Sequence, residues 1–130
     1  MTSVLKGRRI LVVEDEPLIA MMLVEILEGE GCEVAGPAYN EAQSLELLQT
    51  EQIDVAILDF NLGRDQTSAG IATQLVERDI PFLFATGYGV QALRNANWTQ
   101  PAIGKPYHAP EVIAAVTRLL DTPLDAKSVA

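Results

Sequence analysis

The fold of this chain follows from the stretch ILVVEDE at residues 10–16, in which four apolar residues lead directly into three acidic ones. Three other apolar runs of the same kind occur at residues 55–58, 81–85 and 101–103. A strand that is apolar at every position is typical of a parallel sheet that helices cover on both faces. A weaker run at residues 32–36, closed by Pro37, predicts a fifth strand.

Between these runs, apolar residues recur at the spacing of helices. The expected helices lie at residues 18–27, 40–48, 71–76, 89–98 and 112–120. Gly29 and Gly31 offer stops for the first helix. Asn40 followed by Gln43 resembles a capping box at the start of the second, and Pro110 suits the first turn of the last.

The segment at residues 89–98 is the weakest of these helices, because it carries two asparagines and only Val90 and Leu93 as clear apolar anchors. We expect a short or mobile helix there. A helical bundle is the alternative reading of the helical segments, but the β-branched runs between them favour strands. Five strands alternating with five helices predict an α/β protein with a doubly wound parallel sheet and right-handed crossovers.

The composition limits the class of protein. With 130 residues, 48% of them hydrophobic and 21% charged, the chain has the size and composition of one globular domain. Eighteen acidic residues against nine basic ones give a net charge of −9. That charge disfavours binding to nucleic acid, and it suits a bound cation or a basic partner surface.

Other sequence features exclude a membrane span and a secreted protein. The longest apolar run, at residues 18–24, falls short of the roughly 20 residues that cross a bilayer. Lys6, Arg8 and Arg9 interrupt the layout of a secretory signal. The single cysteine, Cys32, excludes an internal disulfide and a cysteine-clustered zinc site, and we expect its side chain to be half-buried. We therefore expect a cytoplasmic protein.

Chemically active side chains follow four of the predicted strands. They are the acids of residues 14–16, Asp59, Thr86 and Lys105. Because ligands of parallel sheets bind outside the carboxyl ends of the strands, we expect these side chains to share one crevice. Carboxylates held close together repel one another unless a cation neutralises them, and oxygen ligands select Mg²⁺, or else Mn²⁺.

Each of these residues also has an ordinary structural interpretation. Asp15 could cap a helix, with Glu16 interacting favourably with the helix dipole. Asp59 could be a turn residue, Lys105 a solvated loop lysine, and Thr86 an unremarkable strand end. Their joint placement at four strand ends favours the shared site.

These residues resemble the receiver domains of bacterial two-component response regulators, over about residues 8–121. The resemblance implies a flavodoxin-like receiver fold with strand order 2-1-3-4-5. It also divides the chain into an N-terminal extension at residues 1–7, a receiver domain at residues 8–121 and a polar tail at residues 122–130, with no output domain.

The resemblance assigns a role to each position. An acidic pair matching Glu14 and Asp15 holds Mg²⁺ together with the phosphoacceptor, which matches Asp59. Asn61 matches the residue whose backbone carbonyl binds the metal. Thr86 and Lys105 match the phosphate-binding switch pair, and the Lys105–Pro106 peptide bond is expected to be cis.

Two departures from the family pattern narrow the resemblance. The aromatic residue usual three positions before the lysine is Ala102 here, and the usual Pro-Gly of the phosphoacceptor loop is replaced by residues 61–67. The motif FATGYG at residues 84–89 resembles the FAT GUY receivers, which lack that aromatic residue. Tyr88 is therefore a candidate for the missing ring, and equally for a loop aromatic that packs on the fourth helix.

The resemblance implies a signalling phosphoacceptor, not an enzyme. A histidine kinase or phosphotransfer protein would donate the phosphoryl group to Asp59, and a downstream protein would bind the face of the fourth helix, fifth strand and fifth helix. No contact with nucleic acid or membrane is expected.

The remaining residues of note have ordinary structural roles. We expect His108 to be solvated or to cap the last helix, and we expect Trp98 and the pair Met21-Met22 to be packing residues.

Three other functions compete with this one. A phosphohydrolase that forms an aspartyl phosphate usually carries Asp-x-Asp, and Asn61 stands at the second position, where it cannot protonate a leaving group. A flavodoxin-like flavin protein would need a phosphate loop where the acids of residues 14–16 would repel the phosphate. A receiver-fold binding module without phosphorylation is disfavoured by the intact Asp59 and Lys105.

Overall fold

The structure is a computed structural model that describes residues 4–63, 66–87 and 90–121. In this part of the chain, five strands alternate with five helices. In chain order they are β1 (Arg9–Val13), α1 (Pro17–Gly29), β2 (Glu33–Ala38), α2 (Glu41–Thr50), β3 (Val55–Asp59), α3 (Ala69–Glu77), β4 (Phe82–Thr86), α4 (Gln91–Asn95), β5 (Ala102–Gly104) and α5 (Ala109–Asp121). The strands form one parallel sheet in the order β2-β1-β3-β4-β5, which confirms the predicted fold and strand order.

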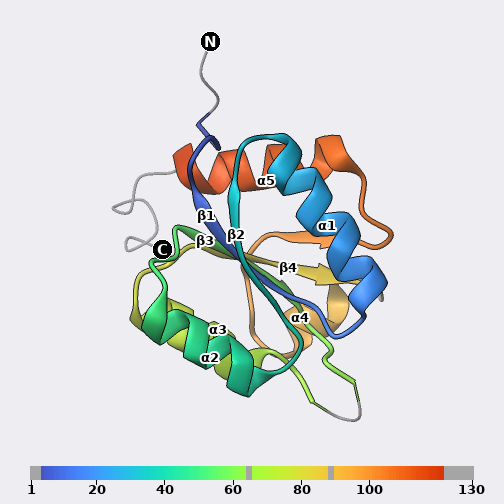
Figure 1. Ribbon diagram of the computed structural model, residues 1–130. Helices are drawn as coiled ribbons and strands as arrows, with labels where there is room; N and C mark the ends of the chain where they lie inside the picture. Colours follow the sequence, from blue (N-terminus) through green and yellow to red (C-terminus); the bar gives the residue numbers. More distant parts are fainter. Residues whose placement is uncertain (1–3, 64–65, 88–89, 122–130) are drawn as a thin grey trace.

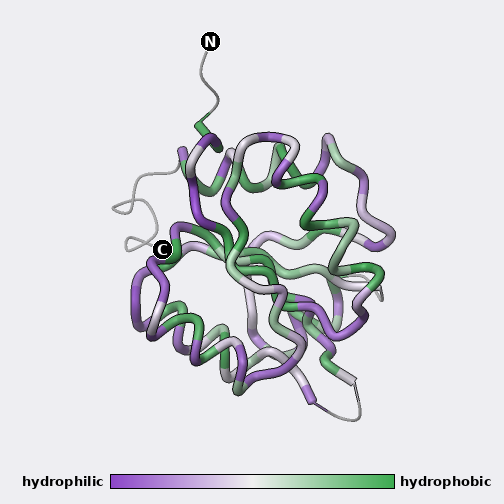
Figure 2. The backbone as a smooth tube through the Cα atoms, in the orientation of Figure 1, coloured by the Kyte–Doolittle hydropathy of each residue, from purple (hydrophilic) through white to green (hydrophobic). Residues whose placement is uncertain are grey.

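The sheet lies between two layers of helices. Helices α1 and α5 cover one face, and α2 and α3 cover the other, with α4 at the end of the second layer (Figure 1). Hydrophobic segments meet between the layers, while hydrophilic residues lie mainly on the outer surfaces (Figure 2).

Strand β3 shows why the apolar runs are continuous. All five of its residues are buried. Val55 and Ile57 belong to the core under α1 and α5, whereas Ala56 and Leu58 belong to the core under α2 and α3. One strand therefore contributes to both cores. Burying a valine, isoleucine or leucine side chain fully stabilises the fold by roughly 1.5–3 kcal/mol.

The predicted end of the second strand is wrong. Strand β2 does not include Cys32, and it continues through Pro37 to Ala38. Proline is tolerated because β2 is an edge strand, where a missing backbone N–H costs little. Gly36 has a φ of +103°, and a Cβ there would lie 2.7 Å from the backbone N of Ala38, so this bend requires glycine.

The expected half-burial of Cys32 is also wrong, because its side chain is buried.

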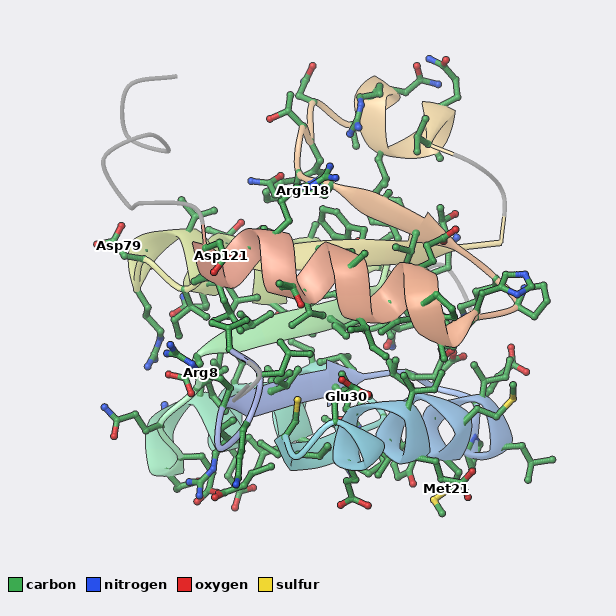
Figure 3. All side chains as sticks on the ribbon, turned by 90° about the horizontal axis from the view of Figure 1, so that it is seen from above. Arg8, Met21, Glu30, Asp79, Arg118 and Asp121 are labelled. Carbon is green, nitrogen blue, oxygen red and sulfur yellow. The ribbon has the colours of Figure 1, made fainter. Side chains whose placement is uncertain are left out.

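The expected packing role of Met21 and Met22 is also wrong. Helix α1 buries Ala20, Leu23 and Leu27, and the two methionines are 50% and 47% exposed. Met21 points away from the sheet in Figure 3. The stretch is apolar on nearly every side, so its sequence did not show which face turns inward.

Helix α2 begins as predicted at a capping residue. The Asn40 Oδ1 accepts a hydrogen bond of 2.9 Å from the backbone N–H of Gln43. The reciprocal bond of a capping box is displaced by one residue, because the Gln43 Oε1 accepts from the backbone N–H of Tyr39.

Helix α4 is short, as expected, with five residues. It buries Leu93 alone among its residues, and the chain after it places Trp98 edge-on against Phe82 and Phe84. The predicted packing role of Trp98 is therefore confirmed. Within the described ranges, no helix is long and apolar enough to cross a membrane.

Candidate functional site

Three carboxylates meet at the carboxyl ends of β1 and β3. The two strands pair directly, with Val13 beside Leu58, so the residues that follow them emerge together at one edge of the sheet. One ligand oxygen each from Glu14, Asp15 and Asp59 lies within 4.8 Å of the others. Glu14 is fully buried and Asp59 is 4% exposed, so their charges are largely withdrawn from water.

Lys105 reaches this cluster from the end of β5. Its Nζ lies 2.9 Å from the Asp59 Oδ2, and 2.7 and 3.1 Å from the Glu14 Oε1 and Oε2. The lysine side chain is 15% exposed, so it is an interior cation and not a solvated loop lysine. The Lys105–Pro106 peptide bond is cis.

The electrostatics of the cluster show an excess of negative charge. Burial, together with a hydrogen bond and repulsion from Asp59, raises the pKa of Glu14 to about 8, although Lys105 opposes the shift. Burial and then Asp59 also raise the pKa of Asp15. Burial alone would lower the pKa of Lys105, but its hydrogen bonds to Glu14 and Asp59 outweigh burial and raise it.

The loop after β3 fixes the surroundings of Asp59. Asn61 and Thr67 form an antiparallel bridge, flanked by hydrogen bonds from the Leu62 N–H to the Gln66 oxygen and from the Ser68 N–H to the Phe60 oxygen. Asn61 and Thr67 are thus a non-hydrogen-bonded pair, in which the N–H and C=O of each residue point away from the other residue. The Asn61 N–H accordingly donates to the Asp59 Oδ1 at 3.3 Å.

Two further residues border the cluster. Thr86 is buried at the end of β4, and its backbone oxygen accepts a hydrogen bond of 3.2 Å from the Lys105 N–H. Gly63, with a φ of +81°, brings the loop against Asp15, because a Cβ at this position would lie 3.2 Å from the Asp15 Oδ2.

The helix-cap interpretation of Asp15 is not what the structure shows. The N-cap of α1 is Glu16, and none of the described side chains makes a capping hydrogen bond there. Asp15 instead lies within the carboxylate cluster.

The structure adds two residues that the sequence analysis did not identify. Tyr107 is 7% exposed, and burial and the charges of Glu14 and Asp59 raise its pKa. Gly63 stands out only through its positive φ and its distance to Asp15. Gly63 lies in the loop of residues 61–67 and Tyr107 follows the Lys105–Pro106 pair, but no residue pattern singled out either of them. Tyr88 lies outside the described residues, and Ala102 is half-buried without a ring.

The cluster's donor set fits a hard divalent cation. When ionised, three carboxylates carry three negative charges, and Lys105 supplies one positive charge. The remaining charge of two equals that of a divalent ion, and all the offered atoms are oxygens, the ligands that Mg²⁺ and Mn²⁺ take.

Residues 10–117 match the response regulator receiver domain family. The chain belongs to this family. The receiver domain is 39% identical to SdrG from Sphingomonas melonis Fr1, whose solution structure it matches with a TM-score of 0.77 over 88% of this chain and 97% of that one.

Curated relatives are bacterial regulators. The receiver domain is 29% identical to the transcriptional regulatory protein PdtaR of Mycobacterium tuberculosis, over 84% of this chain and 55% of PdtaR. It is 26% identical to the chemotaxis protein CheY of Bacillus subtilis, over 88% of this chain and 99% of CheY. The chain thus spans about half the length of PdtaR.

Proposed function

We propose that this receiver domain accepts a phosphoryl group on Asp59 from a histidine kinase or phosphotransfer protein, in a reaction that requires Mg²⁺ or Mn²⁺. It would act as a phosphorelay switch or shuttle in the bacterial cytoplasm. The observation that carries the proposal is the cluster of Glu14, Asp15 and Asp59 with Lys105 bonded into it.

Asp59 is suited to be the nucleophile. Its Oδ1 accepts from the Asn61 N–H and its Oδ2 from Lys105, so the carboxylate is held in one orientation. One of its oxygens would attack phosphorus in line, forming the acyl phosphate bond as the bond to the donor's nitrogen breaks. The product is an aspartyl phosphate that water later hydrolyses.

The metal would be held by Asp15 and Asp59, by Glu14 through water, and by the backbone carbonyl of Asn61. The Asn61 carbonyl and N–H both turn away from Thr67, toward the side on which the N–H meets Asp59. A bound Mg²⁺ would neutralise the carboxylates and the incoming phosphoryl oxygens.

Lys105 and Thr86 are suited to bind the phosphoryl oxygens. Lys105 already lies beside the Asp59 carboxylate, and Thr86 ends the neighbouring strand. A fixed ammonium and a hydroxyl would stabilise the charge that spreads over the phosphoryl group during transfer.

We further propose that the domain is of the FAT GUY type. The residues Phe84, Ala85, Thr86 and Gly87 and the absence of a ring at Ala102 support this assignment. The output would leave through α4, β5 and α5, where α4 is only one turn long and thinly packed. The role of Tyr88 as the switch aromatic remains a prediction.

The competing functions are less well supported. A phosphohydrolase would need an acid at Asn61 to protonate its leaving group. A protein-binding module without phosphorylation would have no use for a buried cluster in which three carboxylates repel one another.

The test is phosphorylation by acetyl phosphate, followed by intact mass. We expect the mass of one phosphoryl group to appear on the wild type with Mg²⁺, and not after chelation of the metal. Asp59→Asn should show no addition. Asp79→Asn is the matched control, because Asp79 is exposed with a φ of +58°, which asparagine tolerates. Equal phosphorylation of Asp59→Asn and wild type would refute the proposal.

A further inference from the structure

Tyr107 is a buried polar residue that the proposed reaction does not use. It follows Lys105 by two positions, on the segment that joins β5 to α5. Its ring packs in the core under α1 and α5. Its hydroxyl is buried and has no hydrogen-bond partner in the part of the chain that the structure describes. Burying a hydroxyl without a hydrogen-bond partner lowers the free energy of unfolding, and native structures contain few such groups.

The hydroxyl of Tyr107 lies beside the acidic cluster. After burial, the charges of Glu14 and Asp59 contribute most to its raised pKa, and the availability of Glu14 as a hydrogen-bond acceptor raises it further. The Glu14 Oε1 is likewise buried, and its contact in the described part of the chain is the ion pair of 2.7 Å with Lys105. Glu14 therefore depends on Lys105, while the hydroxyl of Tyr107 has a donor that no described residue uses.

Glu14 and Asp59 share Lys105 as their cation. Its Nζ donates hydrogen bonds to the Glu14 Oε2 and the Asp59 Oδ2, and it lies 2.7 Å from the Glu14 Oε1. When Lys105 turns toward a phosphoryl oxygen, its contacts with Glu14 lengthen. The fully buried Glu14 then has less to compensate its charge, and a buried carboxylate in this condition requires another donor.

We propose that Tyr107 is a positioning residue, whose hydroxyl donates a hydrogen bond to Glu14 when Lys105 turns to the phosphoryl group. This inference rests on the proposed function. The new bond keeps the Glu14 carboxylate oriented toward the metal while Lys105 is engaged elsewhere. A phenol serves this purpose well, because it stays neutral beside the acids and adds a donor without adding charge.

The test compares Tyr107→Phe with wild type, and uses Tyr39→Phe as the matched control. Tyr39 also follows a strand of this sheet, but it is 37% exposed, so water can satisfy its hydroxyl and the loss of that hydroxyl should not matter. The probe is Mg²⁺ added in the presence of beryllofluoride, a stable mimic of the phosphoryl group. The readout is the Mg²⁺ concentration that half-saturates the rise in melting temperature, which does not depend on turnover.

We expect Tyr107→Phe to raise this concentration roughly tenfold, the lower end of what losing a partner of a metal ligand costs. Tyr39→Phe should leave it unchanged. In a Glu14→Gln background, adding Tyr107→Phe should have little further effect, because the hydroxyl acts through the carboxylate. Without Mg²⁺, Tyr107→Phe should melt at or slightly above wild type, since it removes an unpartnered buried hydroxyl.

An unchanged half-saturating concentration in Tyr107→Phe would overturn the inference. A tenfold effect that persists in the Glu14→Gln background would overturn it as well, because the hydroxyl would then act elsewhere. A wild type that does not respond to Mg²⁺ and beryllofluoride would instead refute the proposed function, and the two failures are thereby distinguished.

Discussion

Raising the pH should destabilise this protein in the absence of a divalent cation. Burial and Asp59 raise the pKa of Glu14 to about 8, whereas an unfolded glutamate titrates near 4.5. Between these values the folded protein holds a proton that the unfolded chain has released. The contribution of Glu14 to the free energy of unfolding is therefore fully present at low pH and is lost as the pH rises through the folded pKa. Asp15, whose pKa is also raised, acts in the same direction.

The size of the effect follows from linkage. Each pH unit between the two pKa values costs about 1.4 kcal/mol, so the step from pH 6 to pH 8 should cost roughly 2 kcal/mol once the partial titration near pH 8 is included. For a domain of this size that is a fall in melting temperature of roughly 8 °C.

The assay is a set of melting curves at pH 6, 7 and 8, recorded with EDTA and with 10 mM Mg²⁺. Glu14→Gln should remove most of the pH dependence, because it has no proton to lose. Mg²⁺ should also flatten it, because the bound cation favours the ionised carboxylates. Glu46→Gln, an exposed change on α2, is the control and should behave as wild type. A melting temperature with EDTA that is constant or rises between pH 6 and 8 would refute the electrostatic argument.

Three further predictions concern Lys105, Gly63 and helix α4. Lys105→Met keeps the length of the side chain but leaves Glu14 and Asp59 without their cation, so chemical denaturation at pH 8 should show a loss of roughly 3 kcal/mol; no loss would mean that the ion pairs do not form. Gly63→Ala forces a side chain into a left-handed conformation 3.2 Å from the Asp15 Oδ2. It should cost about 1 kcal/mol and weaken Mg²⁺ binding in calorimetry, while Gly29→Ala, whose Cβ meets nothing within 4 Å, should do neither. Hydrogen exchange of residues 90–97 should change most on phosphorylation, because α4 has one buried residue and low local stability; changes confined to α2 and α3 would contradict this.

Most of the fold could be predicted because each strand is buried on both faces. A run such as residues 55–58 has no polar position to place in water, and that leaves few arrangements besides a covered parallel sheet. The prediction failed where tertiary position decides. Pro37 was read as the end of a strand, yet an edge strand needs no donor there. Met21 and Met22 belong to a stretch with too many apolar residues to define one inward face.

The location of the candidate site was predictable for a similar reason. Parallel strands all end at one edge, so polar residues that follow buried runs must gather there. Tyr107 could not be found in this way, because it lies beyond the strand end. Its relation to Glu14 arises only from how the segment after Lys105 returns to the core.

The arrangement of donors around Lys105 explains how chemistry at one strand can affect another. Lys105 follows β5, and its ammonium contacts Glu14 after β1 and Asp59 at the end of β3. The backbone N–H of Lys105 donates a hydrogen bond to Thr86 at the end of β4. On the proposed function, a phosphoryl group on Asp59 competes with Glu14 for this ammonium. A shift of Lys105 away from Glu14 would act directly on β5 and on the segment leading into α5. Because Ala102 offers no ring, the lysine itself provides one direct physical route from the acceptor to the proposed output face.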